Sequence, residues 1–182
     1  GPTYAAISSG FARWNDIDVH VGDRTIRSTG HGFCGIARKE LLRILQTRAR
    51  ELGVELVFKR EIADVEALRR DCDLLVGADG LKSAVRTRWQ DAFGPSLDVR
   101  KCRYIWLGTT QRFGAFTFAF KESPHGLFQI HANQFDGQHG TVIGETNAAA
   151  GRAAGLDRAT EAESIAYCEA LFRKELGGHP LL

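Results

Sequence analysis

The sequence contains no methionine, not even at residue 1, where the chain opens on Gly1-Pro2. We therefore expect these 182 residues to be a segment of a longer protein. Only four cysteines occur, spaced far apart and without a Cys-x-x-Cys pair, so we predict reduced thiols and neither a disulfide framework nor a structural zinc site. Among the six histidines, His125 and His131 share a strand face, but no third ligand accompanies them, and no metal site is predicted.

The sequence also lacks a strong charge of one sign and any long apolar run. Lys and Arg number 24 against 22 Asp and Glu, the formal charge is +2, and no basic stripe is visible, which argues against a nucleic-acid partner. No apolar run approaches the roughly 20 residues of a membrane helix, and no signal peptide opens the chain. We predict a cytoplasmic protein without a membrane partner, and we find no Ser-His-Asp set or carboxylate pair to name as catalytic.

The first half of the chain combines features of strands and a helix. Residues 17–21 and 24–28 flank a Gly-Asp turn and predict a hairpin, and apolar residues spaced three to four apart predict a helix from Arg38 to Gly53. Short apolar runs at 54–58, 61–65 and 72–76 predict strands. The fold class is therefore α/β with mixed α+β character, and its first part is a Rossmann-like nucleotide-binding layer.

After Pro95 the pattern changes to four strand-like runs, at 103–111, 115–121, 127–134 and 141–145, which predict an antiparallel sheet. A capping box at Thr160 begins a last helix that we expect to end before Gly177, and the Ala- and Gly-rich residues 148–155 predict a mobile loop. The expected domains are a partial nucleotide-binding domain at 1–98, a sheet domain at 99–157 and a C-terminal helix at 158–182.

One motif, from Cys72 to Arg86, carries the main functional signal. An apolar run leads into Gly77-Ala78-Asp79-Gly80, and a helix is predicted to open at Ser83. Glycines allow a sharp turn and a close approach to a ligand, and a carboxylate at that turn accepts hydrogen bonds from sugar or ribityl hydroxyls. The alternative is a strand, an Asp-Gly turn and a surface helix without a ligand.

The pattern Asp-Leu-Leu-Val-Gly-Ala-Asp-Gly-x-x-Ser-x-Val-Arg resembles the FAD-dependent aromatic hydroxylases of the p-hydroxybenzoate hydroxylase class. The resemblance implies that Asp79, Gly80 and Ser83 lie against FAD and that Arg86 serves NAD(P)H. Residues 30–42 look like the Arg-x-x-Leu helix start of the same family, which implies that Arg38 contacts the FAD pyrophosphate or ribityl chain. The family's first βαβ unit, with its Gly-x-Gly-x-x-Gly fingerprint, is expected to precede this segment.

Residues 32–36, 104–110, 116–118, 125–129 and 154–157 look like the branch of salicylyl-CoA 5-hydroxylase and 2-aminobenzoyl-CoA monooxygenase/reductase. The likeness is weakest over residues 144–152. In this family the sheet covers the aromatic substrate, so the resemblance makes five residues candidates for the substrate wall: Trp106, Gln111, Phe118, Phe128 and His131. Alternating phenylalanines such as those at 116, 118 and 120 share one strand face and more often belong to a core than to a ligand wall.

The resemblance implies that NAD(P)H reduces FAD, that O2 is captured as a flavin C4a-hydroperoxide, and that its distal oxygen is transferred to an aromatic ring. The expected substrate is a small aromatic compound, in particular an aromatic acyl-CoA such as salicylyl-CoA or 2-aminobenzoyl-CoA. Two alternatives stay open. One is an indole or tryptophan-type substrate on the same flavin fold, and the other is an inactive fragment with an incomplete FAD site.

Overall fold

The computed structural model describes all 182 residues, which divide into two units that we describe separately. One unit joins residues 1–54 to residues 101–182, and the other comprises residues 55–100. The sequence placed domain limits at residues 98 and 157, and these limits stay a prediction. The helices are α1 (Pro2–Ser9), α2 (Arg38–Glu51), α3 (Val65–Arg70), α4 (Ala84–Arg88), α5 (Gln90–Phe93), α6 (Ala148–Ala153) and α7 (Glu161–Leu171), and the strands are β1 (Ala12–Trp14), β2 (Ile17–Val21), β3 (Arg24–Ser28), β4 (Phe33–Gly35), β5 (Cys102–Thr109), β6 (Phe116–Ser123), β7 (Gly126–Gln134) and β8 (Gly140–Asn147).

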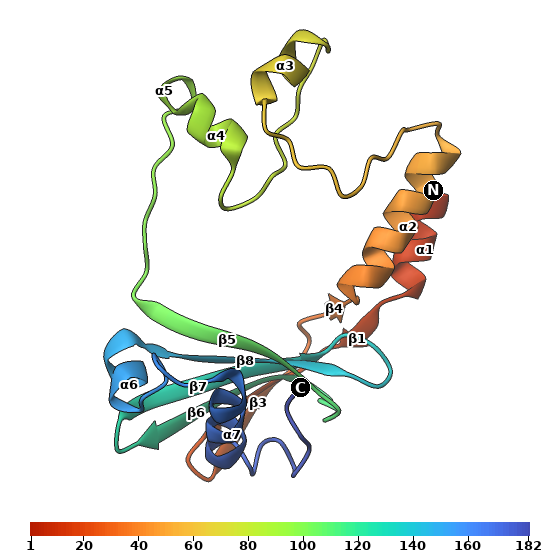
Figure 1. Cartoon of the computed structure of the whole chain (residues 1–182). Helices are drawn as coiled ribbons and strands as arrows, with labels where there is room; N and C mark the ends of the chain where they lie inside the picture. The colour runs from red at the N-terminus through yellow and green to blue at the C-terminus, as the bar shows by residue number, and fades with distance from the viewer. The chain divides into compact units, whose positions relative to one another are not determined.

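A six-stranded mixed sheet organises the larger unit, with the strand order β3-β2-β6-β7-β8-β5 (Figure 1). The predicted hairpin and the four predicted strands of the second half are confirmed, and those four pair antiparallel. The sheet is larger than predicted because β2 pairs parallel with β6, opposite residues 116–120, and brings β3 with it. The hairpin, assigned by sequence to the nucleotide-binding part, therefore extends the second sheet.

The two faces of this sheet differ. Alternate residues of β6, β7 and β8 are buried on the face covered by α6 and α7 (Figure 1), where Ile130, Val142 and Phe172 are 1% exposed. That face holds the hydrophobic core of the unit. Residues on the opposite face are only half buried, and Trp106 on β5 is 68% exposed. One face is therefore structural, and the other is open.

Two predictions in the C-terminal part need correction. Residues 148–155, expected as a mobile loop, begin with helix α6, because the Asn147 side chain accepts hydrogen bonds from the amides of Ala149 and Ala150. An Asx cap before a run of alanines favours a helix. The Thr160 capping box is confirmed, but α7 ends at Leu171, and turns occupy the residues up to Gly178.

The smaller unit contains α3, α4 and α5 and no strand, so the strands predicted at 54–58, 61–65 and 72–76 are wrong for this chain. A buried parallel strand needs hydrogen-bonded neighbours on its sheet, and these runs pair with no other segment. Leu74 and Val76 consequently remain 78% and 73% exposed. The helix predicted to open at Ser83 is confirmed as α4.

Residues 30–35 have the spacing Gly-x-Gly-x-x-Gly of a dinucleotide-binding turn. In a dinucleotide-binding unit this turn follows a parallel strand and opens a helix. Here its last three residues form β4, which pairs antiparallel with β1, so the spacing does not mark such a unit.

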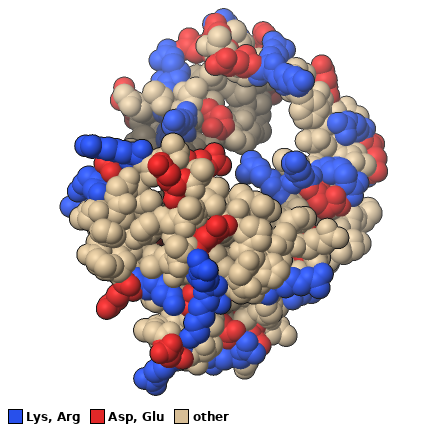
Figure 2. Space-filling view, turned by 60° about the horizontal axis from the view of Figure 1, so that its bottom comes forward, with Lys and Arg blue, Asp and Glu red and all other residues tan.

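None of the helices is both long and apolar enough to cross a membrane. Lys and Arg lie interspersed with Asp and Glu on the face drawn in Figure 2.

Candidate functional site

The carboxylate of Asp79 is the centre of a hydrogen-bonded turn in the smaller unit. The Ser83 hydroxyl donates to Oδ1 at 2.6 Å, and the amides of Ala84 and Val85 donate to Oδ2 at 2.7 and 3.2 Å. The hydrogen bond from Ser83, together with those from the backbone, lowers the pKa of the Asp79 carboxyl. A carboxylate has about four acceptor positions, so one remains for an outside donor such as a hydroxyl.

Gly80, Gly77 and Arg86 shape the same turn. Gly80 has a φ of +79°, the left-handed region that favours glycine, and a Cβ on Gly77 would meet Val85 Cγ1 at 2.7 Å. The Arg86 guanidinium donates to the carbonyls of Gly80 and Leu81. The predicted cofactor residues Asp79, Gly80, Ser83 and Arg86 are therefore brought together, and Arg86 stabilises the turn itself.

Arg38 belongs to the other unit, as the first residue of α2. Its side chain is exposed, and the N-cap residue, Ala37, makes no side-chain hydrogen bond to the helix. The first turn of this 14-residue helix therefore keeps amide donors next to a guanidinium, a combination suited to an anionic group. The expectation that Arg38 and Asp79 serve one cofactor stays a prediction.

Stacked aromatic rings line part of the open sheet face. Trp14 stacks on Phe33 and on Phe116 with ring centroids 6.1 and 6.2 Å apart. Phe116 in turn contacts Phe118 at 5.0 Å and stacks on the His131 ring at 6.0 Å. Because aromatic and β-branched neighbours on one face interact directly, this group holds the orientation of the His131 ring. Sequence patterning found the sheet residues but not Trp14 and Phe33, which come from another part of the chain.

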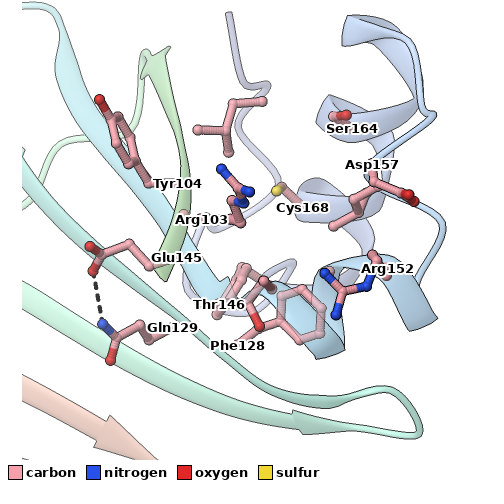
Figure 3. Close-up of a pocket in the computed structure, with 16 residues that line it drawn as sticks. Arg103, Tyr104, Phe128, Gln129, Glu145, Thr146, Arg152, Asp157, Ser164 and Cys168 are labelled. Atoms are coloured by element: carbon pink, nitrogen blue, oxygen red, sulfur yellow. Dashed lines mark hydrogen bonds between the residues drawn. The ribbon is translucent and has the colours of Figure 1, made fainter. Parts of the chain in front are cut away.

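A polar group adjoins the aromatic rings. Glu145 on β8 accepts a 2.8 Å hydrogen bond from Gln129 Nε2 on β7 (Figure 3). The Glu145 Oε2 atom also lies 3.4 Å from Nδ1 of His131. The side chains of His131 and Glu145 are each 25% exposed. Neither Gln129 nor Glu145 was predicted as a site residue. The two-residue period of β7, which places Gln129 on the face of His131, is the signal that identifies the first of them.

The five predicted wall residues divide between the faces. Trp106, Phe118 and His131 share the open face, since Phe118 lies opposite His131 and Ile143 lies opposite both His131 and Trp106. Phe128 belongs to the buried core and contacts Tyr167 of α7 with ring centroids 5.3 Å apart. Gln111 follows β5 and lies beside Gly177. Phe128 and Gln111 are thus not neighbours of the aromatic group on the open face.

A pocket of about 610 Å³ lies at the end of the sheet against α6 and α7. Its lining includes the apolar Phe128, Cys168 and Phe172 and the guanidinium-bearing Arg103 and Arg152. Gln129 and Glu145 also line this pocket. In Figure 3, Phe128 points toward Arg152, and Gln129 and Glu145 lie apart from it, hydrogen-bonded to each other. Burial raises the pKa of the Cys168 thiol to about 11, so it is no nucleophile at neutral pH.

Known proteins resemble nearly the whole chain, although no family model matches it. The chain is 40% identical over 177 residues to the salicyloyl-CoA 5-hydroxylase of a Streptomyces species, an alignment that covers 93% of the chain and 34% of that protein. The protodeoxyviolaceinate monooxygenase of Chromobacterium violaceum is 30% identical over 165 residues, 90% of the chain and 44% of that protein. The chain thus spans between about a third and a half of these curated relatives.

Solved structures show the same fold at low sequence identity. PqsL, a probable FAD-dependent monooxygenase from Pseudomonas aeruginosa, superimposes with a TM-score of 0.57 and 14% identity over 98% of the chain and 57% of that protein. A variant of the flavin-dependent brominase Bmp2 gives a TM-score of 0.51 and 12% identity over 98% of the chain and 51% of that protein. At these identities the likeness concerns the fold alone.

Proposed function

We propose that this chain is part of an FAD-dependent aromatic monooxygenase and that the whole protein, of which the chain spans a part, hydroxylates an aromatic substrate with FAD, NAD(P)H and O2. The observation that carries the proposal is the open sheet face, where Trp106, Phe118 and His131 lie together. The Trp106 side chain is 68% exposed, so its ring is available to stack on the aromatic ring of a substrate.

The cofactor residues fit part of a flavin nucleotide. Asp79 retains one acceptor position for a ribityl or ribose hydroxyl, and Gly80 has open space where a side chain would stand. Arg38 and the amides of the first α2 turn suit a pyrophosphate, which a planar guanidinium binds through two donors. FAD, when bound, supplies the chemistry that activates O2. The chain's own residues hold the nucleotide and orient the ring to be hydroxylated. A Rossmann-like FAD-binding layer in the whole protein is part of this proposal.

The substrate we propose is an aromatic acyl-CoA. The 40% identity to a salicyloyl-CoA 5-hydroxylase favours it, and basic side chains are present to bind the CoA phosphates. Six basic residues are candidates for this role: Arg24, Arg27, Arg100, Lys101, Arg103 and Arg112. Three of them are engaged within the chain, Arg27 by Asp18, Arg100 by Asp98 and Arg112 by the Gly137 carbonyl. Arg24, Lys101 and Arg103 remain for an outside phosphate. An indole-type substrate is the second candidate, because protodeoxyviolaceinate monooxygenase is 30% identical.

The test uses the full-length protein. We expect bound FAD, NAD(P)H oxidation stimulated by salicyloyl-CoA, and one atom of ¹⁸O2 in a hydroxylated product. Parallel assays with 2-aminobenzoyl-CoA and an indole rank the substrates. A protein that retains no FAD, or that incorporates no oxygen with any of these compounds, contradicts the proposal. Expressing residues 1–182 alone tests the alternative of an incomplete site, for which we expect less than stoichiometric FAD.

A further inference from the structure

We propose that the pocket between the sheet, α6 and α7 is a second ligand site, which binds a small amphipathic anion: an apolar or aromatic body that carries one carboxylate or phosphate group. This inference goes beyond the proposed function. The apolar lining of the pocket belongs to the sheet face that α6 and α7 cover, whereas Trp106, Phe118 and His131 lie on the open face. A volume of about 610 Å³ is within the range of roughly 300–1,000 Å³ that is common for small-molecule sites.

The apolar part of the pocket is built on the ends of three strands. Phe128 of β7 lies opposite Thr146 of β8, and Ile105 of β5 lies opposite Gly144 of β8. The other apolar side chains of the lining are Leu156, Cys168 and Phe172. Phe128 is 5% exposed and belongs to the core, so its position is fixed before any ligand arrives. A fixed apolar wall binds an apolar body without a cost for ordering its own side chains.

Glycine keeps the pocket open where α6 meets the sheet. Gly151 of α6 lines the pocket, and a Cβ placed on it would contact Thr146 Cγ2 at 3.5 Å, an ordinary van der Waals distance. On the sheet, a Cβ on Gly144 would lie 3.2 Å from Ile105 Cγ2 and 3.6 Å from Cys168 Sγ. A larger side chain at Gly151 would therefore enter the pocket without a clash at its Cβ.

Two guanidinium groups supply positive charge to the pocket. Arg103 projects from β5 and Arg152 from α6, and both point into the space between the sheet and α7 (Figure 3). Neither forms an ion pair or a side-chain hydrogen bond in the chain, in contrast to Arg27, which pairs with Asp18. Both arginines are exposed and Phe128 is buried, so the charge lies at the entrance and the apolar wall beneath it. A guanidinium with free donors binds an oxyanion through two of them.

Two carboxylates also line the pocket, and neither neutralises these arginines. Glu145 belongs to the open face of β8, where it accepts the hydrogen bond from Gln129. Asp157 follows α6, and its carboxyl group lies away from both guanidinium groups in Figure 3. No ion pair joins either carboxylate to Arg103 or Arg152. The pocket therefore favours an anion over a cation.

The test measures the binding of three naphthalene probes to the full-length protein by isothermal titration calorimetry. We expect 2-naphthoate and 2-naphthyl phosphate to bind at a single site, and the tighter of the two identifies the preferred oxyanion. Neutral 2-naphthalenemethanol should bind at least 10-fold more weakly. Arg103→Gln and Arg152→Gln should each lower the affinity for the anions roughly 10-fold. Arg158→Gln is the matched control, because Arg158 is exposed close to α6 but does not line the pocket, and it should leave the affinity unchanged.

A second variant tests the apolar part. In Gly151→Leu the new side chain occupies the pocket, so all three probes, including the neutral one, should bind at least 10-fold more weakly. Its thermal unfolding and FAD content report whether the variant folds. The two arginine variants change exposed side chains, and they decide the question if Gly151→Leu does not fold.

The outcomes separate this inference from the proposed function. A wild-type protein that binds neither anion overturns the inference, and so does equal affinity in the wild type and both arginine variants. Arg103 is also a candidate to bind the CoA phosphates, so CoA is added as a competitor, and we expect it not to displace 2-naphthoate. Displacement would make the pocket part of the substrate site and would overturn a second site. A protein that binds 2-naphthoate as expected but does not hydroxylate salicyloyl-CoA contradicts the proposed reaction alone.

Discussion

Ser83 Oγ donates a 2.6 Å hydrogen bond to Asp79 Oδ1 and accepts the amide of Arg86 at 2.9 Å. The hydroxyl therefore connects the turn to the first turn of α4, and Ser83 is 6% exposed although its unit has almost no core. Local hydrogen bonds, rather than packing, hold the Asp-Gly motif in shape. Its geometry consequently depends on one carboxylate.

Replacing Asp79 with Ala should lower the FAD content of the full-length protein and open the N-terminus of α4. The amides of Ala84 and Val85 lose their acceptor, so their hydrogen exchange, measured by NMR or mass spectrometry, should accelerate roughly tenfold or more. Asp73→Ala removes an exposed carboxylate of the same unit and is the control. Unchanged exchange together with unchanged FAD content would remove Asp79 from both roles.

Acid should weaken the β2–β3 hairpin through Asp18. Its carboxylate receives two hydrogen bonds from Arg27, at 2.7 and 2.6 Å, and these lower the pKa of Asp18. A carboxyl group with a lowered pKa in the folded state contributes stability above its unfolded pKa, and this contribution disappears as the pH falls through the folded value. We expect the contribution to be complete at neutral pH and to be lost below about pH 4.

The variant Asp18→Asn tests that expectation by thermal unfolding. Its melting temperature at pH 7 should fall by roughly 2–4 °C, and the difference from the wild type should shrink on acidification. Asp23→Asn is the control, because Asp23 lies in the exposed turn of the same hairpin and pairs only with Lys174. A difference that stays constant from pH 7 to pH 3 would show that the ionised carboxylate of Asp18 is not the source.

Sequence patterning predicted most local elements of the larger unit, because hairpin, helix and strand signals there agree with the tertiary contacts. The capping box at Thr160 and the helix start at Ser83 are encoded by residues adjacent in sequence, and both are confirmed. The apolar run at 72–76 failed because a strand exists only with a neighbour, which periodicity alone does not supply. Parallel pairing of β2 with β6 joins residues about 100 positions apart, and no local signal encodes it. Glu145 escaped prediction for the same reason, since only the β7–β8 register reveals its two partners.

The two faces of the sheet should respond differently to the loss of an aromatic ring. Trp106→Ala removes a ring that is 68% exposed, so the free energy of unfolding should change by no more than about 0.5 kcal/mol. Phe128→Ala empties a core position that is 5% exposed and should cost about 3–5 kcal/mol. Denaturant titration measures both values. In turnover assays of full-length protein, Trp106→Ala should raise the KM for salicyloyl-CoA, and an unchanged KM would remove Trp106 from the substrate wall.

The cysteines should label at very different rates. Burial raises the pKa of the Cys168 thiol to about 11, so its thiolate fraction at pH 8 is on the order of one in a thousand, and its sulfur is also shielded by the core. Cys34 and Cys102 are exposed. With iodoacetamide at pH 8, mass spectrometry should show Cys34 and Cys102 alkylated at least 100-fold faster than Cys168 in the native protein. The three rates should converge in denaturant, because unfolding removes the burial that disfavours the thiolate. Fast native labelling of Cys168 would mean that α7 opens away from the sheet.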